Sequence, residues 1–428
     1  MLALQEKLFG FCILLTLYLL LLIVNDLYIS IIYAYMGFSS DVDLYEVFLS
    51  IVVIFIAVIT ANGKDTLAFY QYMILVLIMV PTAVLYSAGV ASGEVLAITL
   101  LSTLIVNVLS NIRFSPYFFS GEVAAKPLIR ILVVLSFAYI IAAVMLGGMK
   151  YFNLSIFDVY EFRELAQANL PWYFGYFYSV VSKVFIPIIL AMSWKMRSPV
   201  YGLLGVALAV VTFGLTSHKA VLLAPVLIVA LNYFSFRGIG LKMAAIFVAT
   251  VAVSWADFYL DEHVNMETFG DFGSMFARRV LLVPAQLNSF YIEYFSVAES
   301  YYWADSRVSF GLINSPYTLS SVNLIGMLYL SNENIAANSG WIGSGYANAG
   351  LMGAIIYSVL LAVLLAYLRE CSNRLGAKFV TASSATSVMI IINSTDIVTA
   401  IFTHGLLFLL LIYSLNIRYE NFEKEEQQ

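Results

Sequence analysis

The sequence has little charge, since only 11% of its 428 residues are Asp, Glu, Lys or Arg while 62% are hydrophobic. A typical soluble domain has about 25% charged and about 45–50% apolar residues. So few charged side chains cannot cover the surface of a water-soluble protein of this length, which argues against a soluble enzyme and a disordered chain. The net charge of −5 also argues against binding of a nucleic-acid backbone. The composition predicts a polytopic membrane protein.

Cysteine and histidine are scarce as well. Cys12 and Cys371 are too few for a disulfide framework or a cysteine-based metal cluster, and His218, His263 and His404 are too widely spaced for a metal motif. The signatures G-x-x-x-x-G-K-[ST], G-x-G-x-x-G and G-x-S-x-G do not occur in the chain. We therefore expect no metal, no other cofactor, no nucleotide-binding loop and no serine hydrolase.

Long apolar runs are what the chain has in abundance. A membrane-spanning helix needs about 20 apolar residues, and twelve such helices are predicted, at about 8–33, 47–62, 68–90, 95–111, 129–148, 172–194, 199–215, 220–236, 243–260, 346–367, 379–395 and 400–417. The first run is too long for a cleavable signal peptide. The expected fold is all-α and polytopic, with one transmembrane domain over residues 1–428.

The positions of the basic residues predict the orientation, because cytoplasmic loops are enriched in Lys and Arg. With twelve spans and both termini cytoplasmic, 14 of the 21 basic residues lie inside. The outer side then has a large loop at 261–345 and a smaller one at 149–171. The inside loops are too short for a nucleotide-binding domain, so any chemistry is expected outside, where ATP and nucleotide sugars are absent.

Seven basic residues depart from this pattern: Lys150, Arg163, Lys183, Lys219, Arg278, Arg279 and Arg307. A basic side chain inside the bilayer costs about 2.5–3.5 kcal/mol on insertion scales, so such positions are candidates for binding an anion. Lys150 is interpreted as an ordinary helix-end residue. Arg163 lies between Glu161 and Glu164, and it either clamps an anionic substrate or forms an ion pair with one of these glutamates.

The turn LTSHKA (215–220) contains His218 and Lys219. Thr216 or Ser217 is expected to cap the following helix. A helix N-terminus beside a cation favours an anion, so the turn predicts a binding site. The alternative is a polar loop tip without a ligand.

Arg278 and Arg279 lie in the apolar and aromatic segment 270–296. The segment predicts an interfacial or re-entrant helix that is ended or kinked by Pro284. Neighbouring residues on a helix point about 100° apart. One arginine is therefore expected to bind phosphate while the other contacts lipid headgroups or a carboxylate. Alternatively, both arginines only anchor the helix at the headgroups.

Two further basic residues, Arg307 and Lys183, have structural explanations. Arg307 follows Asp305 closely enough for an ion pair. Lys183 falls in the middle of a predicted span, where it must face protein or water, and a structural pair with Asp257 or Asp396 is expected.

Aromatic and acidic side chains of the outer segments offer further chemistry. Aromatic rings suited to stacking on sugar faces are Tyr291, Tyr294, Tyr301, Tyr302, Trp303 and Trp341, although each one is also a candidate for the core. The candidate general bases are Asp261, Glu262, His263, Glu267, Asp271, Glu293, Glu299 and Asp396. The sequence does not choose among them.

Four features together resemble the bacterial O-antigen polymerases of the Wzy type. They are Arg163 in the smaller outer loop, LTSHKA (215–220), FARRVLLVPAQ (276–286) in the large loop, and the Gly/Asn/aromatic run ANSGWIGSGYANAGLMG (337–353). Glycines in the last run allow close backbone packing or approach to a ligand. The resemblance covers most of the chain as an arrangement of short motifs.

The resemblance implies a membrane glycosyltransferase with a GT-C-like fold in the bacterial inner membrane and an active site facing the periplasm. Its substrates would be a growing glycan on undecaprenyl pyrophosphate as donor and a lipid-linked repeat unit as acceptor. The reaction would be metal-independent and inverting. A chain-length regulator is a candidate partner, and no nucleic acid is expected.

The resemblance also implies roles for particular residues. Arg163 and Arg279 would hold the pyrophosphate with help from Arg278 and Lys219, and these four are the predicted catalytic residues. The predicted substrate-binding residues are His218, Arg307, Tyr291, Trp341 and Asn338.

Two other functions stay open. An O-antigen ligase uses the same donor with lipid A core as acceptor, but it relies on a histidine late in the long loop, where this chain has only His263 at the start. A transporter or lipid-oligosaccharide flippase predicts charges spread over two similar halves and no large one-sided loop.

Overall fold

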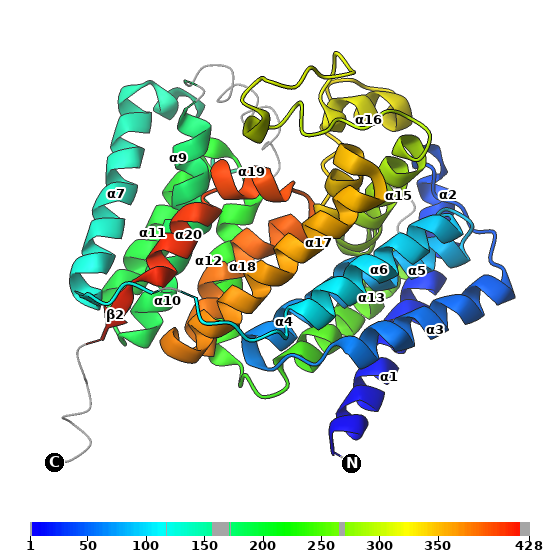
Figure 1. The fold of residues 1–428 in the computed structure, drawn as a ribbon, viewed down its shortest axis with the longest axis horizontal. Helices are drawn as coiled ribbons and strands as arrows, with labels where there is room; N and C mark the ends of the chain where they lie inside the picture. Colours follow the sequence, from blue (N-terminus) through cyan, green and yellow to red (C-terminus); the bar gives the residue numbers. More distant parts are fainter. Residues whose placement is uncertain (1, 117, 156–170, 172, 265–269, 420–428) are drawn as a thin grey trace. The chain divides into compact units, whose positions relative to one another are not determined.

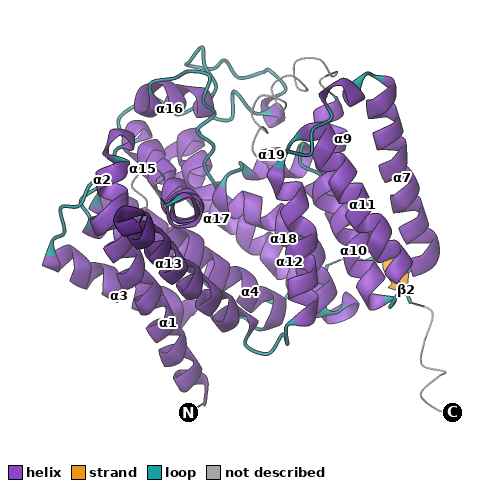
Figure 2. Ribbon diagram, turned by 180° about the vertical axis from the view of Figure 1, so that it is seen from behind, coloured by secondary structure: helices purple, strands orange, loops and turns teal. Residues whose placement is uncertain are grey.

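The computed structural model describes residues 2–116, 118–155, 171, 173–264 and 270–419, and it is built almost entirely of helices (Figure 1, Figure 2). The first half contains α1 (Leu2–Val24), η1 (Asn25–Ile29), α2 (Ser30–Ile32), η2 (Ala34–Met36), α3 (Leu44–Thr60), α4 (Asp65–Ile74), η3 (Leu75–Met79), α5 (Val80–Ser87), α6 (Gly93–Leu109), β1 (Glu122–Ala124), α7 (Ala125–Met145), η4 (Gly148–Tyr151), α9 (Phe174–Val180), η5 (Val181–Phe185), α10 (Ile186–Lys195) and α11 (Pro199–Thr216). The second half contains α12 (Lys219–Tyr233), α13 (Ile239–Val264), α14 (Asp271–Gly273), η6 (Ser274–Leu282), α15 (Val283–Phe295), η7 (Arg307–Ser309), α16 (Ser321–Leu330), α17 (Trp341–Leu375), α18 (Ala377–Asn393), α19 (Ile397–Phe402), α20 (Leu406–Ser414) and β2 (Asn416–Arg418).

The apolar runs predicted from the sequence form helices. Seven helices among the described residues are long and apolar enough to cross a membrane, and five further apolar helices are shorter. The predicted span 400–417 is wrong as a continuous helix. Gly405 has φ +83° and separates α19 from α20, because that left-handed conformation cannot continue a right-handed helix. The fold is therefore all-α, with several helices suited to a bilayer.

The chain divides into two compact units. The first comprises residues 1–114, 237–366 and 389–398, and the second comprises 115–236, 367–388 and 399–428. In the first unit α13 packs against α1 and α4, and α3 packs against α5 and α6. Within this unit, α16 and the loops around it lie at the end opposite the start of α1 (Figure 1).

The second unit is a helix bundle with a small strand pair. Here α10 packs against α11, α12 and α7, and α20 packs against η5. The strands β1 and β2 pair in parallel, with Val123 opposite Ile417. This pair joins two segments that are almost 300 positions apart in the chain, and it lies at the end of the unit away from the start of α9 (Figure 1).

Three helices are widened just before a proline. The π-helical segments η3, η5 and η6 end two residues before Pro81, Pro187 and Pro284. Proline cannot donate an N–H to the carbonyl four residues earlier and collides with it, so the wider turn relieves both problems. The helix that contains Arg278 therefore continues through Pro284 to Phe295. Of the two predicted effects of Pro284, an end and a kink, the structure excludes the end.

The long helix α17 is bent near its start. Ala349 has φ −158° and Gly350 has φ +55° with ψ −143°, and the second conformation is essentially restricted to glycine. Gly345 and Gly353 meet at the bend, because a Cβ on Gly345 would lie 2.7 Å from the Gly353 carbonyl oxygen. The glycine run predicted to allow close backbone packing does so here.

Candidate functional site

A group of polar side chains gathers around α9 in the second unit. We call Tyr178, Ser179, Lys183, His218 and His404 the α9 cluster. The His218 ring stacks on the Tyr178 ring, with centroids 4.8 Å apart and planes 21° apart. His404 Nδ1 lies 3.4 Å from Ser179 Oγ, and the charge of Lys183 acts on the His404 ring. Two histidines that are 186 positions apart in the chain thus contact adjacent residues of one helix.

The N-terminus of α12 adds Lys219 to the α9 cluster, because Lys219 directly follows His218 in the chain. His218 occupies the N-cap position and makes no side-chain cap hydrogen bond, and the half-buried Lys219 is the first helical residue. The expectation that Thr216 or Ser217 caps α12 was wrong, since Thr216 Oγ1 donates to the Thr212 carbonyl at 2.7 Å. The first-turn N–H groups of α12 therefore have no side-chain acceptor from the cap.

Ser217 is the most unusual residue of this turn. It has φ +54°, it is 2% exposed, and its Oγ has no hydrogen-bond partner among the described atoms. A buried hydroxyl without a partner costs about 1–3 kcal/mol. Together with the N–H groups of α12, this hydroxyl would be satisfied by an acceptor-rich ligand.

Pro187 leaves the backbone carbonyl of Lys183 available for hydrogen bonds from another helix. Pro187 cannot bond to the Lys183 carbonyl, which instead accepts hydrogen bonds from Thr386 Oγ1 at 3.2 Å and Ser387 Oγ at 3.0 Å. Among the described residues of the second unit, no carboxylate forms an ion pair with Lys183. In the first unit, Asp257 accepts from the Gly273 N–H and Asp396 accepts from the Tyr357 hydroxyl. The expected pairing of Lys183 with one of these two acids stays a prediction.

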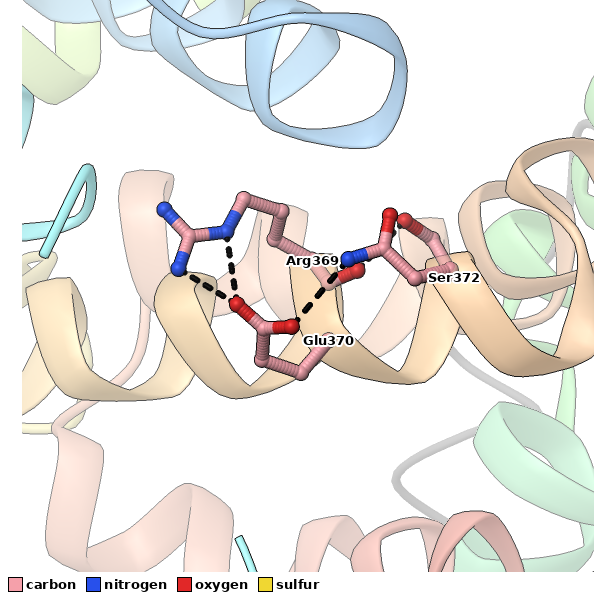
Figure 3. Close-up of polar contacts among 4 residues, drawn as sticks. Arg369, Glu370 and Ser372 are labelled. Carbon is pink, nitrogen blue, oxygen red and sulfur yellow. Dashed lines mark hydrogen bonds and ion pairs between the residues drawn. The ribbon is translucent and has the colours of Figure 1, made fainter. Parts of the chain in front are cut away.

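The described part of the second unit contains only two carboxylates, and both are paired with arginine. Glu122 lies 3.2 Å from Arg418. Glu370 accepts two hydrogen bonds from Arg369, at 3.1 and 2.6 Å, near the end of α17 (Figure 3). Both carboxylates that the structure describes in the second unit are thus bound to arginine and not to Lys183.

Arg278 and Arg279 take opposite positions on η6 in the first unit. Arg278 is 5% exposed, its Nε and Nη2 donate to Ser274 Oγ at 3.2 and 2.8 Å, and its guanidinium lies 4.0 Å from the centroid of the Tyr33 ring. Burial lowers the pKa of Arg278, and the nearby Tyr33 opposes that effect. Arg279 is exposed. The prediction that the two arginines do not share one site agrees with this arrangement.

The remaining predicted site residues are dispersed. Arg163 lies outside the described residues, as does the side chain of Arg307. Tyr291 and Trp341 are buried, with Tyr291 donating to the Ala337 carbonyl at 3.0 Å and the Trp341 indole donating to Ser358 Oγ at 3.1 Å. Neither ring presents a face to a ligand, so the expected stacking on sugar is wrong for both. Asn338 is exposed.

His404 and Ser179 were missed by the sequence reasoning. The signal was present but weak: Gly405 breaks a predicted span directly after His404, and small or polar residues surround it. In the structure a Cβ on Gly405 would lie 3.1 Å from the Val180 Cα and 3.0 Å from a Val184 methyl. This glycine allows His404 to approach α9 closely.

Among the described residues, no group of three or more His, Cys, Asp or Glu side chains is arranged to hold a metal ion. Comparison of the chain with protein-family models, with curated proteins and with solved structures gives no match.

Proposed function

We propose that the chain is a membrane glycosyltransferase that polymerises oligosaccharide repeat units carried on undecaprenyl pyrophosphate. The observation that carries the proposal is the α9 cluster, in which two lysines and two histidines lie around α9 and the start of α12, next to the buried Ser217 hydroxyl. A diphosphate offers the negative charge and the acceptor oxygens that such a set requires. The resemblance of short motifs to the Wzy-type polymerases supports the same substrate.

The proposed reaction takes its energy from the donor itself. The hydroxyl of the acceptor sugar attacks the anomeric carbon of the donor glycan from the face opposite the diphosphate, and the configuration is inverted. Lys219, Lys183 and the N–H groups at the start of α12 stabilise the charge that develops on the departing lipid diphosphate. Arg279 and Arg163 stay candidates for the same role, while Arg278 supports the fold of η6.

The proposal includes a topology. The chain would cross the bacterial inner membrane about twelve times in a GT-C-like arrangement, with cytoplasmic termini and the α9 cluster at the periplasmic side. The distribution of basic residues supports this orientation.

Reconstitution tests the function. The purified chain in liposomes is given lipid-diphosphate-linked repeat units, and the products are separated on a gel. A ladder of glycan lengths is expected from the unmodified chain, and Lys219→Ala and His404→Ala are expected to lose it. Lys150→Ala, which changes an exposed lysine of the same unit, is the matched control and should retain the ladder.

Other outcomes identify the alternatives. Transfer of the glycan to lipid A core without chain growth would make the protein a ligase. Movement of the lipid-linked oligosaccharide across the liposome membrane without any transfer would make it a transporter.

A further inference from the structure

The first unit contains a polar cavity at the end where α1 begins (Figure 1). Its volume of about 720 Å³ lies within the range of about 300–1,000 Å³ that is typical of small-molecule sites. Three segments that are far apart in the chain line it: the start of α1, the turn between α3 and α4, and the start of α13. All of the lining residues belong to the first unit.

Basic residues from each of the three segments line the cavity. Lys7 lies on α1, Lys64 is the N-cap residue of α4, and Arg237 lies two residues before α13. Lys7 donates to the Ile59 carbonyl, which leaves two of its three N–H groups. Lys64 and Arg237 are exposed, and no hydrogen bond or ion pair joins either one to another described residue of the first unit. Three cations thus converge on one cavity with N–H groups available for an anion.

Two helices also begin at this cavity. In α4 the side chain of the N-cap residue Lys64 makes no cap hydrogen bond, and α13 starts at Ile239. The first N–H groups of a helix have no partner within the helix and carry partial positive charge, which favours an anion. The helix starts therefore act in the same direction as the three cations.

Tyr72 of α4 contributes a hydroxyl without a partner. It lines the cavity, it is 9% exposed, and its hydroxyl makes no hydrogen bond with another described residue of the first unit. The ring lies against α13, since a Cβ on Gly240 would be 2.5 Å from Tyr72 Cδ2, and a Cβ on Gly10 of α1 would overlap the hydroxyl oxygen. Buried polar groups are nearly always hydrogen-bonded, so this hydroxyl indicates a ligand that offers an acceptor oxygen.

The cavity also contains two carboxylates. Glu6 of α1 and Asp65 at the start of α4 line it, and both are exposed. No ion pair joins either one to a basic residue of the described first unit, and the charge of Glu6 acts on the Tyr72 hydroxyl. These carboxylates would repel a simple anion. A ligand with an ammonium group beside its phosphate would use charges of both signs.

The position of the cavity matches the depth of lipid headgroups. The helices Leu4–Ile32, Asp65–Ser87 and Ile239–His263, which are long and apolar enough to cross a membrane, all begin beside it. The predicted topology puts these three helix starts on the inner side. Basic pockets between transmembrane helices on that side are suited to lipid headgroups.

We propose that this cavity binds the phosphoethanolamine headgroup of a phospholipid. The three basic residues and the Tyr72 hydroxyl hold the phosphate, and the two carboxylates hold the ammonium. The geometry that carries the proposal is the convergence of both signs of charge with an unpartnered, buried hydroxyl in one cavity at the start of three apolar helices. This lipid is not a substrate, so the inference does not depend on the proposed polymerase function.

The first experiment measures the choice of lipid. Phosphatidylethanolamine, phosphatidylcholine and phosphatidylglycerol with the same acyl chains are titrated separately into the full chain in detergent, and bound lipid is counted by native mass spectrometry. Phosphatidylethanolamine should bind at least about tenfold more tightly than the other two, because the choline group has no N–H to donate and the glycerol group has no charge. Equal binding of the three lipids, or tighter binding of phosphatidylglycerol, would overturn the proposal.

The second experiment tests the residues that hold the phosphate. Lys64→Gln and Arg237→Gln should each weaken phosphatidylethanolamine binding at least about tenfold, and Asn62→Trp should block binding by filling the cavity. Because all three positions are exposed, the melting temperatures should not change. Arg113→Gln is the matched control, since Arg113 is an exposed arginine of the same unit that does not line the cavity. Binding that is unchanged in Lys64→Gln and Arg237→Gln would contradict the phosphate site.

The third experiment tests the ammonium site and the buried hydroxyl. The double variant Glu6→Gln with Asp65→Asn should lose the preference for phosphatidylethanolamine over phosphatidylcholine and should bind phosphatidylglycerol more tightly. Tyr72→Phe should weaken binding of both ethanolamine and choline lipids, because the phosphate is common to them. Tyr18→Phe, which removes a buried hydroxyl that is hydrogen-bonded to Ser87, is its control. A double variant that keeps the preference would show that the carboxylates do not bind the ammonium.

Soluble competitors distinguish a lipid site from a site for a free phosphate. Glycerophosphoethanolamine has the same headgroup without acyl chains, so it should displace the lipid, but only at a much higher concentration than the lipid itself. Inorganic phosphate at that concentration should not displace it. If inorganic phosphate displaced the lipid as well as glycerophosphoethanolamine does, the cavity would be a site for a free anion and the proposed headgroup would be wrong.

Discussion

The backbones of Gly345 and Gly353 touch across the bend of α17, with no space for a side chain on either residue. A Cβ on Gly353 would overlap the Gly345 carbonyl oxygen, which is a backbone atom and cannot rotate away. The same bend supplies the carbonyls that hold Tyr301 and Tyr302. The close packing of the two glycines therefore helps to hold the loop that contains Tyr301 and Tyr302.

Gly353→Ala is expected to destabilise the first unit by about 1–3 kcal/mol or more through this overlap. Gly175→Ala is the control, because a Cβ added to Gly175 would meet nothing within 4 Å and alanine favours a helix over glycine by about 1 kcal/mol. Thermal unfolding in detergent measures both. Equal melting temperatures for the two variants would contradict the close packing at the bend.

Arg278 and Arg279 are expected to differ in how much they contribute to the free energy of unfolding. Arg278→Ala removes two hydrogen bonds to Ser274 and the contact with the Tyr33 ring, and it should lower the free energy of unfolding by about 2–4 kcal/mol. Arg279→Ala should change it by no more than about 0.5 kcal/mol. Denaturant titration compares the two variants. A stable Arg278→Ala protein with lost donor binding would instead give Arg278 the phosphate-binding role.

The α9 cluster is expected to bind the diphosphate group of the donor. Lys219→Ala should raise the donor KM at least about tenfold, as expected for loss of a charge-assisted contact. The KM for the acceptor should not change. Steady-state kinetics with each substrate varied in turn measure this. An unchanged donor KM in Lys219→Ala and His404→Ala would remove the α9 cluster from the donor site.

The stability of the folded chain is expected to depend on pH through Glu293. Burial raises the pKa of its carboxyl above the ordinary value, so the folded chain binds the proton more readily than the unfolded chain. Stability contributed by this group is present at low pH and is lost as pH rises through the folded pKa. Glu293→Gln should therefore raise the melting temperature at pH 7, and the gain should vanish below pH about 4. A gain that is equal at both pH values would show that the charge is not its cause.

The orientation in the membrane can be tested with cysteines at exposed positions. In a chain without Cys12 and Cys371, Asn314→Cys should react with an impermeant maleimide on intact cells. Ser235→Cys should react only after permeabilisation, since its loop carries Arg237 on the predicted inner side. Both positions are exposed. The reverse pattern would overturn the predicted topology and with it the periplasmic site.

The sequence alone was sufficient to predict the helices, and it pointed to some residues of the candidate site. Apolar runs of about 20 residues predict helices because burial in lipid or protein requires them. Lys219 and His218 were found because a cation at a tight turn opposed the charge pattern. Arg278 was also found, but its role was not, since a contact with Tyr33 some 245 positions away leaves no local trace.

Composition and spacing determined that this is an all-α chain suited to a bilayer, because hydrophobicity and helical length are properties of neighbouring residues. Only the tertiary structure decided which few polar groups meet. His404 joins Ser179 because Gly405 lets two helices approach, and Asp396 meets Tyr357 from a position 39 residues further along the chain. These side-chain contacts depend on the backbone conformation of single residues and on packing between distant helices. Hydrophobic periodicity and residue spacing in the sequence carry no information on either.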